Sequence, residues 1–500
     1  MKVVLISTLI PNQGLATLSS ILKNAGYDVT MVFMMIVKRE KRTYYKKELK
    51  QLELICKNCD LVGISSFSST ALNAIQIIDF LKGKVPNIVW GGVHATLYPE
   101  HCITPCDIVC VGEGEGAILD LANAIKNNKP IDNIKNLWIK KDNNIIKNPV
   151  RNLIDKLDEI PFPDFDIENH FILKKGYIVK FKEEDFEEDI RFTTQRGCPN
   201  GCDFCSNNAF NKLYEGKRKC ILRWNSIDYI INGLAPIIKK FPSILHWYIG
   251  DDLFFSRSLE QIKEFSEKYK KKIGIKFLCL ADPRSITEEK MGLLVGTGCN
   301  RIQIGIQSTE RVNREIYHRY TTNEQILTCS KILKKFSKEI LTNYDVINCN
   351  PYEKPEDIIN LINLLRKIPK PYRLTVSSLV YYPGTNIANR ALKDRLITKK
   401  DLLEEDNYYK LRILLKRSKN LYLDVITNLM EGKTTKNKIG FIHDSWFNYL
   451  LNEKRIKKNL KNPFLVVLFI RFFWIHDWLK YKIFPKFPIL IKMRQRLMKL

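Results

Sequence analysis

Three cysteines stand close together within the run Arg196-Gly197-Cys198-Pro199-Asn200-Gly201-Cys202-Asp203-Phe204-Cys205. Three residues separate the first two cysteines, two separate the last two, and a proline and a glycine break the chain between them. Such a loop turns three sulfurs toward one point, as a soft metal centre requires. Three thiolates occupy three irons of a 4Fe-4S cube and leave the fourth iron open. The spacing therefore predicts an iron-sulfur cluster with one open iron.

A zinc site is the alternative interpretation of the same cysteines. A structural zinc ion is closed by four ligands, and the nearest further cysteine, Cys220, stands alone rather than in a second pair. The pattern favours the cluster, with Cys198, Cys202 and Cys205 as its ligands.

The cysteine pattern, with the aromatic Phe204 between the second and third cysteines, resembles the signature of the radical S-adenosylmethionine (SAM) superfamily. This resemblance implies that the open iron chelates the amino and carboxylate groups of SAM. It also implies that the reduced cluster cleaves SAM to a 5'-deoxyadenosyl radical, with electrons from an external donor of the flavodoxin or ferredoxin type.

The region 191–395 contains the elements that must position this loop. Apolar runs at 191–194, 247–249, 276–280, 301–306, 345–347 and 374–380 alternate with amphipathic, helix-like segments. Six such repeats predict a partial parallel (β/α)6 barrel, in which chemistry lies at the carboxyl ends of the strands. The first of these strands delivers the cysteine loop.

Polar residues follow several of the predicted barrel strands. Residues 250–252 (Gly-Asp-Asp) follow the second strand, and Arg284 follows the third. Gln307 ends the fourth, where the family often carries Gly-Ile-Glu-Ser; glutamine keeps the hydrogen bonding of glutamate and drops its charge. The resemblance implies SAM contacts for Phe204, Gly250, Asp251, Asp252, Arg284, Gln307 and Ser308.

Residues 1–145 show a similar alternation of apolar runs, at 3–7, 29–34, 61–65, 88–90 and 108–111. This rhythm predicts a doubly wound, Rossmann-like parallel sheet, which binds ligands beyond the carboxyl ends of its strands. Serine-rich or glycine-rich loops follow three of the runs, at 65–68, 91–94 and 112–115. Glycine there lets a ligand approach the backbone.

Together these loops resemble the cobalamin-binding domain that precedes the radical domain in one large branch of the superfamily. The resemblance rests on a helix start at Gly14, on Gly91-Gly92-Val93-His94-Ala95-Thr96 followed by Pro99-Glu100, and on Asp107 leading into Gly112-Glu113-Gly114-Glu115. It implies cobalamin contacts for Gly14, Ser65, Ser66, Ser68, Gly91, Gly92, His94, Gly112, Glu113, Gly114 and Glu115.

None of the seven histidines lies in the Asp-x-His-x-x-Gly context of proteins that place a histidine on cobalt. We therefore expect cobalamin to bind base-off without a histidine ligand, and His94 to act as a hydrogen-bonding residue. Cys102, Cys106 and Cys110 recur every four residues, and we interpret them as small buried hydrophobes beside strands.

The formal net charge of +27 raises nucleic acid, anionic lipid and phosphorylated substrates as partners, although a lysine-biased proteome explains it equally well. The thirteen cysteines are an odd number and mostly scattered, which does not suit a disulfide framework. Met1 opens directly onto an apolar run without a basic leader, so no secretory signal is expected. We expect a cytoplasmic protein.

Two further regions complete the predicted organisation. Residues 146–190 form a linker, because Pro161 and Pro163 cannot continue a helix or a central strand. Residues 396–500 form a helical, basic carboxyl-terminal region, in which the apolar run 463–475 is interrupted by Arg471 and flanked by basic clusters. That pattern suits either an interfacial helix on anionic lipid or a helical cap on the barrel. The first interpretation places residues 463–500 against the inner membrane face and suggests a hydrophobic substrate such as a lipid or isoprenoid.

The sequence thus predicts a cobalamin-dependent radical SAM enzyme that methylates, rearranges or cyclises an unactivated small-molecule substrate. One alternative is a radical SAM enzyme that modifies RNA, which the lack of a recognisable RNA module disfavours. Another is a non-catalytic cobalamin-binding or regulatory protein, against which the three cluster cysteines weigh.

Overall fold

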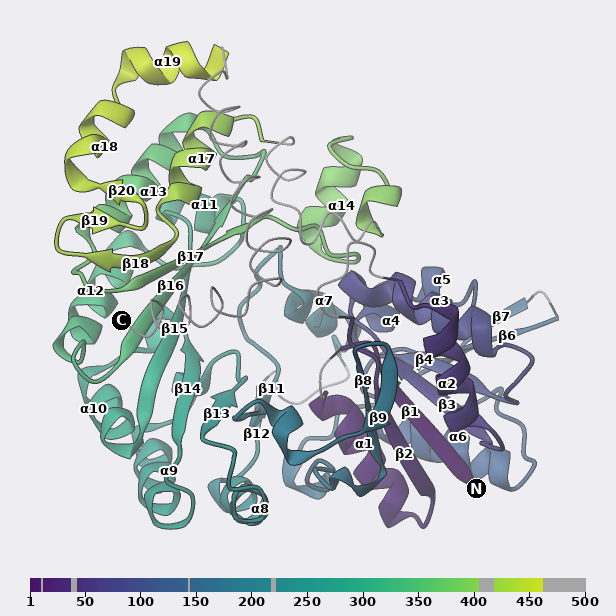
Figure 1. The fold of residues 1–500 in the computed structure, drawn as a ribbon. Coiled ribbons are helices and arrows are strands. Elements are labelled where there is room, and N and C mark those ends of the chain that lie inside the picture. Colours follow the sequence, from purple (N-terminus) through teal and green to yellow (C-terminus); the bar gives the residue numbers. More distant parts are fainter. Residues whose placement is uncertain (10–11, 37–42, 143, 217–221, 404–417, 462–500) are drawn as a thin grey trace.

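The computed structural model describes residues 1–9, 12–36, 43–142, 144–216, 222–403 and 418–461. Figure 1 shows two β-sheets with helices around them, the first in purple and blue and the second in teal and green. The apolar run 463–475, and with it the predicted membrane contact through 463–500, lies outside the described residues.

The first sheet has nine strands in the order β7-β6-β5-β4-β3-β1-β2-β8-β9. The six from β5 to β8 run parallel, whereas β6, β7 and β9 are antiparallel additions at the edges. The strands are β1 (Lys2–Ser7), β2 (Asp28–Phe33), β3 (Leu61–Ser65), β4 (Ile88–Gly91), β5 (Ile108–Cys110), β6 (Leu137–Lys141), β7 (Asn144–Lys147), β8 (His170–Lys174) and β9 (Tyr177–Lys180). The chain passes from β1 to β2 on one side and returns to β3 on the other, so the sheet has a switch point at β1 and β3, where such folds bind ligands.

Helices cover both faces of this sheet, which explains why its central strands are apolar runs without alternation. Val3 and Leu5 of β1 belong to one buried cluster, together with residues of α1 and α6, whereas Val4 and Ile6 belong to a second cluster with residues of α2 and α3. The helices are α1 (Gln13–Asn24), α2 (Lys46–Cys56), α3 (Ala71–Leu81), α4 (Val93–Leu97), α5 (Pro99–Cys102) and α6 (Glu115–Lys126).

The second sheet has the order β10-β13-β14-β15-β16-β17-β18-β19-β20, and its first six strands are parallel. The parallel strands are β10 (Asp189–Phe192), β13 (His246–Ile249), β14 (Lys276–Ala281), β15 (Cys299–Gln307), β16 (Leu341–Asn348) and β17 (Arg373–Ser378). The connecting helices are α8 (Ile227–Lys240), α9 (Leu259–Lys272), α10 (Glu288–Thr297), α11 (Glu310–Glu315), α12 (Asn323–Lys335) and α13 (Pro355–Lys367). Figure 1 shows α9, α10 and α12 on the side of this sheet that faces away from the first domain. The predicted fold class, a Rossmann-like domain followed by a partial parallel barrel, is confirmed.

Smaller elements surround the cysteine loop and extend the chain past the barrel. They are β11 (Gln195–Arg196), β12 (Arg223–Trp224), α7 (Ser206–Leu213), α14 (Asn386–Lys393), α17 (Leu421–Leu429), β18 (Gly432–Thr435), β19 (Lys438–Ile439), β20 (Ile442–His443), α18 (Asp444–Leu450) and α19 (Glu453–Lys461). None of the helices in the described part of the chain has the length and apolar character needed to cross a membrane.

Two regions are organised differently from the expectation. The segment 146–190, expected to be a linker, contributes β8 and β9 to the first sheet. These two strands form a hairpin, and its turn residues Lys175 and Gly176 both have positive φ, at 48° and 87°. The carboxyl-terminal region, expected to be helical, also adds β18, β19 and β20 to the second sheet. In both places short strands form at a sheet edge by pairing with a strand that is distant in the sequence. The local sequence does not reveal such a pairing.

The two domains share one hydrophobic core rather than meeting across a flexible linker. One buried cluster runs from Leu15 of α1 to Phe192 and Trp247 of the barrel. The side chain of Gln13 adds three hydrogen bonds to Thr193, which follows β10: it accepts from the Thr193 N–H at 2.6 Å and hydroxyl at 2.7 Å and donates to the Thr193 carbonyl at 2.9 Å. The first helix of one domain is thereby fixed to the first strand of the other.

The ring of Phe162, between the two prolines, lies directly on Gly233 of α8. A Cβ at Gly233 would be 2.0 Å from the Phe162 ring, which also contacts Phe192 at a centroid distance of 4.9 Å. The glycine therefore makes room for the aromatic ring that joins the domains.

We predict that Gly233→Ala destabilises the protein by about 1–3 kcal/mol through overpacking, although alanine favours a helix by about 1 kcal/mol over glycine. Gly292→Ala in α10 is the matched control, because its Cβ would meet nothing closer than 3.9 Å and alanine should stabilise there. Thermal unfolding measures both variants. Equal stabilisation by the two substitutions, or a Gly233→Ala penalty unchanged in a Phe162→Leu background, would contradict this packing.

Candidate functional site

A cavity of about 440 Å³ opens at the carboxyl edge of the first sheet. It lies at the switch point between β1 and β3. Eight of the residues predicted to contact cobalamin line it: Gly14, Ser65, Gly91, Gly92, Gly112, Glu113, Gly114 and Glu115. Thr193, Arg196 and Phe210, which flank the cysteine loop in the chain, complete the wall.

Two of the glycines let the loops around this cavity pack closely, because no larger residue fits at either position. Gly92 has φ 91°, and a Cβ there would lie 2.7 Å from the Ser65 hydroxyl. Gly112 has φ 89°, and its Cβ would lie 2.1 Å from the Tyr214 hydroxyl. Both conformations are ones that residues with a side chain rarely adopt. The glycine loops therefore present backbone to the cavity, as a bulky polar ligand requires.

Three predicted contact residues lie behind the cavity wall instead of lining it. The Ser66 hydroxyl accepts a hydrogen bond from Trp90 Nε1 at 2.9 Å, and Ser68 Oγ lies 3.0 Å from His94 Nδ1. His94 is fully buried, and this burial lowers its pKa to about 3, so its ring is neutral. Ser66, Ser68 and His94 thus support the loops from behind, because their side chains point into the domain.

Glu113 and Glu115 are the acids of the cavity wall, and both pair with arginines of the barrel. Arg223 Nη2 lies 2.6 Å from Glu113, and Arg196 lies 2.6 Å from Glu115 and 3.3 Å from Glu113. Burial alone would raise the pKa of Glu113, but Arg196 and Arg223 outweigh it and lower that pKa. The second oxygen of Glu115, Oε2, is buried and has no hydrogen-bond donor within the described residues. It is a ready acceptor for an amide or hydroxyl of a bound ligand.

The three predicted cluster ligands lie between β11 and α7. Cys198 and Cys202 are buried, Cys205 is partly buried, and burial raises the pKa of Cys198 to about 12 and that of Cys205 to about 11. At neutral pH these thiols stay protonated until a metal displaces the protons. The donor set, three thiols in one loop, fits a cluster with one open iron.

Residues 317–319 clamp the cysteine loop by touching residues 202–204. The Asp203 N–H donates to the Tyr317 carbonyl at 2.9 Å, and the Phe204 ring meets the Tyr317 ring edge-on at 5.0 Å. Asp203 Oδ2 also lies 2.7 Å from His318, and Arg319 donates to the sulfur of Cys202 at 3.8 Å. The predicted SAM contact Phe204 is therefore half-buried and orients the loop.

Asp282 connects the cysteine loop to two arginines. Arg319 lies 2.6 Å from one of its oxygens, and Arg284 lies 2.8 Å from the other. Arg284 also donates to the Asn200 side chain at 2.6 Å, within the loop itself. The predicted SAM residue Arg284 is thus fixed beside the cluster site by a carboxylate.

The two acids after β13 have different environments. Asp251 is buried, accepts from both the N–H and the hydroxyl of Thr194 at 2.5 Å, and has its pKa raised to about 6 by that burial. Asp252 is exposed and accepts from Asn207 Nδ2 at 2.8 Å, in the helix that follows Cys205. Of this pair, only Asp252 is available to a ligand.

Of the last two predicted SAM residues, Gln307 is accessible to a ligand and Ser308 is not. Gln307 is partly exposed, with φ 67° at the end of β15. Ser308 is fully buried and lies 2.9 Å from Glu353 Oε1.

Sequence reasoning missed the residues that hold the site together: Gln13, Thr193, Arg196, Arg223, Arg257 and Arg319. The only local signal among them is that Arg196 directly precedes the cysteine loop.

Two family models match the chain: the B12 binding domain over residues 3–122 and the radical SAM superfamily over residues 192–389. A methyltransferase of Pyrococcus horikoshii, itself named uncharacterized, is 27% identical over 68% of this chain and 70% of its own length. Bacteriochlorophyllide d C-8(2)-methyltransferase of Chlorobaculum tepidum is 24% identical over 71% and 73%. Anaerobic magnesium-protoporphyrin IX monomethyl ester cyclase of Synechocystis is 25% identical over 40% and 39%.

The fold is shared with solved structures. The cobalamin-dependent SAM radical enzyme OxsB, with aqua-cobalamin and SAM bound, superimposes with a TM-score of 0.65 at 17% identity, over 100% of this chain and 75% of its own. The cofactors that these two domains imply are a 4Fe-4S cluster, SAM and cobalamin, and the three thiols of the cysteine loop and the glycine-walled cavity fit them. This chain belongs to the radical SAM enzymes that carry an amino-terminal cobalamin-binding domain.

Proposed function

We propose that this enzyme transfers a methyl group to an unactivated carbon of a small-molecule substrate. The observation that carries the proposal is the shared wall of the two cofactor sites. Thr193 and Arg196 line the cavity, and the first cluster cysteine, Cys198, follows two residues later. When bound, the cluster and SAM supply a carbon-centred radical and cobalamin supplies the methyl group. Relatives named as methyltransferases support this direction of the chemistry.

The chain's own residues prepare this reaction by holding the cofactors and the cysteine loop in place. Cys198, Cys202 and Cys205 would hold the cluster, and Asp252, the exposed acid beside α7, would hold the amino group of SAM. Arg319 donates to Cys202 and thereby stabilises negative charge on its sulfur. Tyr317 and Arg319 are buried behind the loop, and their contacts hold it in place.

The cavity favours base-off cobalamin without a protein ligand on cobalt. None of the described residues that line it is a histidine, and His94 points away from it. The cavity of about 440 Å³ beside Arg196 would hold the nucleotide tail of cobalamin. The free oxygen of Glu115 and the backbone of the glycine loops would then hydrogen-bond the polar groups of the tail.

Radical cyclisation or rearrangement is the second candidate, supported by the cyclase of Synechocystis among the relatives. It uses the same cofactor sites without methyl transfer. Membership of a family of enzymes sets aside the non-catalytic alternative, and the RNA-modifying alternative gains no support from the named relatives. The apolar substrate, the membrane contact, the cytoplasmic location and the electron donor stay predictions.

We predict that Cys198→Ala, Cys202→Ala and Cys205→Ala together abolish 5'-deoxyadenosine formation, because no thiolate remains to hold the cluster. Anaerobic reconstitution with iron, sulfide and SAM, followed by chromatography of the nucleosides, measures this. Cys279→Ala is a matched control, since that buried cysteine lies in β14 outside the loop and should leave the yield within about twofold. Unchanged 5'-deoxyadenosine in the triple variant would refute the cluster assignment.

Methyl transfer predicts a second SAM product. Enzyme loaded with cluster and cobalamin and given SAM and reductant should form S-adenosylhomocysteine, which requires cobalamin, in addition to 5'-deoxyadenosine. Mass spectrometry of both nucleosides, with and without cobalamin, measures the pair. If 5'-deoxyadenosine appears alone under both conditions, the cyclase-type reaction replaces the methyltransferase proposal.

Base-off binding without a histidine predicts a simple cobalt spectrum. Electron paramagnetic resonance of the enzyme-bound cobalt(II) form should show no splitting from an axial nitrogen, and His94→Ala should leave the spectrum unchanged if the variant remains folded by circular dichroism. Nitrogen splitting that disappears in His94→Ala would show that this histidine reaches the cobalt.

A further inference from the structure

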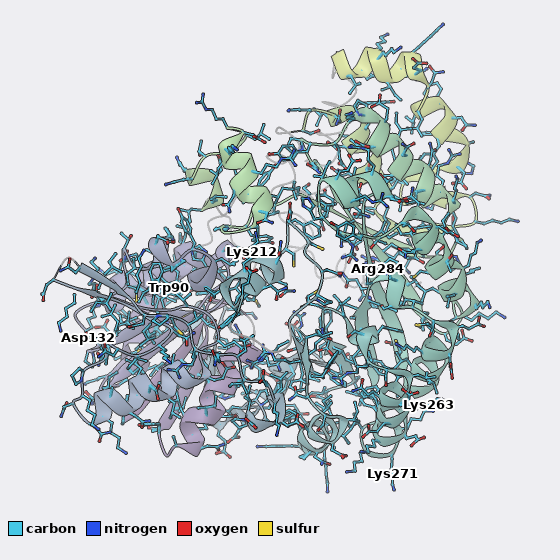
Figure 2. All side chains as sticks on the ribbon, turned by 180° about the vertical axis from the view of Figure 1, so that it is seen from behind. Trp90, Asp132, Lys212, Lys263, Lys271 and Arg284 are labelled. Atoms are coloured by element: carbon cyan, nitrogen blue, oxygen red, sulfur yellow. The ribbon has the colours of Figure 1, made fainter. Side chains whose placement is uncertain are left out.

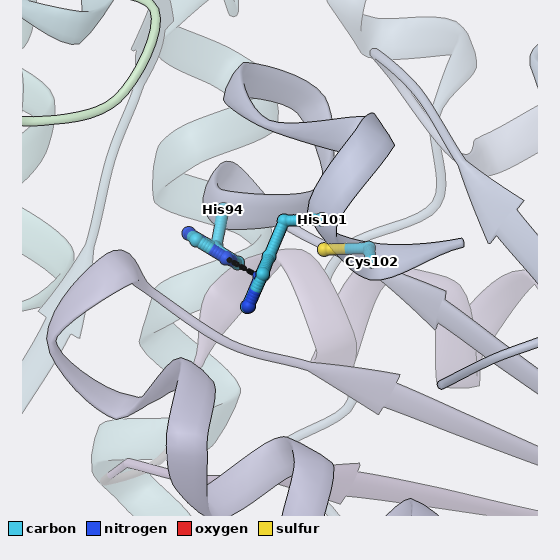
Figure 3. A group of neighbouring side chains, drawn as sticks. All are labelled: His94, His101 and Cys102. Carbon is cyan, nitrogen blue, oxygen red and sulfur yellow. Dashed lines mark hydrogen bonds between the residues drawn. The ribbon is translucent and has the colours of Figure 1, made fainter. Parts of the chain in front are cut away.

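Three potential metal ligands converge behind the cavity wall, apart from both cofactor sites. They are His94 of α4 and His101 and Cys102 of α5. One ligand atom from each lies within 4.8 Å of the other two. The two imidazole rings meet edge to face at an interplanar angle of 82°, and Figure 3 shows the sulfur of Cys102 beside His101. None of the three lines the cavity. In the described chain this is the one group of three or more such side chains that meets at a single point.

The histidine geometry already approximates metal coordination. His94 Nε2 and His101 Nδ1 are 3.1 Å apart. Two nitrogens at about 2.0–2.1 Å from a tetrahedral zinc ion are about 3.3 Å apart, so a small opening of this pair admits the ion. The other nitrogen of His94 is held by Ser68 Oγ at 3.0 Å. Such a partner fixes the ring orientation and leaves Nε2 as the ligand atom, as in protein zinc sites.

The protonation states also suit a borderline metal ion. Burial lowers the pKa of both histidines, so both rings are neutral near pH 7. Cys102 is fully buried, and burial raises its pKa, so it is a thiol until a cation displaces the proton. Binding releases the thiol proton to solvent, while the proton shared by the two imidazoles moves to the outer nitrogen of His101. That histidine is partly exposed and gives the ion and a water access.

Aromatic side chains wall the group on two sides. The His94 ring lies 5.7 Å from the Trp90 ring, and Tyr98 stacks on His101 at 5.5 Å. This shell limits water and strengthens charge interactions inside it. Two neutral imidazoles and one thiolate form a donor set that suits zinc rather than magnesium or calcium.

We propose that His94, His101 and Cys102 bind one Zn²⁺ ion, with a water molecule as fourth ligand. The ion joins α4 to α5 and thereby fixes the loop at Gly91 and Gly92. This loop lines the cavity and directly precedes α4, in which His94 lies. The ion would lie apart from both cofactor sites, because none of its ligands lines the cavity.

The test is a zinc titration of the full-length protein with its cluster already assembled, so that Cys198, Cys202 and Cys205 are occupied by iron. We expect one zinc ion per chain after desalting, measured by inductively coupled plasma mass spectrometry. His101→Ala and Cys102→Ser should weaken zinc binding at least about tenfold. Cys106→Ser is the matched control: this cysteine is equally buried, four residues further on and outside the group, and should keep the ion.

Cobalt(II) in place of zinc identifies the ligands independently of stoichiometry. A sulfur-to-cobalt charge-transfer band should appear in wild-type protein and in Cys106→Ser, and should be lost in Cys102→Ser. His101→Ala, a partly exposed position, separates loss of a ligand from loss of folding, because its circular dichroism should match the wild type. Zinc content equal in wild type and in the His101→Ala, Cys102→Ser double variant, or a charge-transfer band that survives Cys102→Ser, would overturn the proposal.

Discussion

The ion pairs of Arg196 are the interaction on which the rest of the site depends. This residue lines the cavity of the first domain, pairs with Glu113 and Glu115 there, and stands two residues before Cys198. The Glu115 side chain is buried, so removing Arg196 would leave its charge without compensation. The position of the cysteine loop relative to the cavity is thus fixed by ion pairs, and Arg223 reinforces them from the neighbouring strand β12.

A second buried contact fixes the direction in which the cysteine loop leaves the barrel. Asp251 accepts two hydrogen bonds from Thr194, and Arg257 donates to the same Thr194 hydroxyl at 2.8 Å. The segment after β10 is thus held through both the backbone N–H and the side-chain hydroxyl of Thr194. An acid that sequence similarity assigns to ligand binding therefore serves to position the loop, and its exposed neighbour Asp252 remains for the ligand.

These contacts fix the cavity and the cysteine loop relative to each other. Gln13 contributes to the same end, since its amide joins α1 to Thr193 at the junction of the two sheets. Positions held within a fraction of an ångström are what radical and group-transfer reactions between two bound cofactors require.

The sequence by itself determined the six barrel strands and the glycine loops, and it predicts the cluster ligands, because each follows from neighbouring residues: apolar periodicity, glycine at strand ends and cysteine spacing. Only the tertiary structure decided which acid faces the ligand, that 146–190 adds strands to the first sheet, and that Ser66, Ser68 and His94 lie behind the cavity. The tertiary structure also revealed that His94 meets His101 and Cys102. The four-residue spacing of Cys102, Cys106 and Cys110 had indicated only buried hydrophobes. Asp251 and Thr194 are 57 residues apart, and Arg223 and Glu113 are 110 apart. Such pairs depend on how whole elements pack, and local patterns contain no information on a partner so distant in the chain.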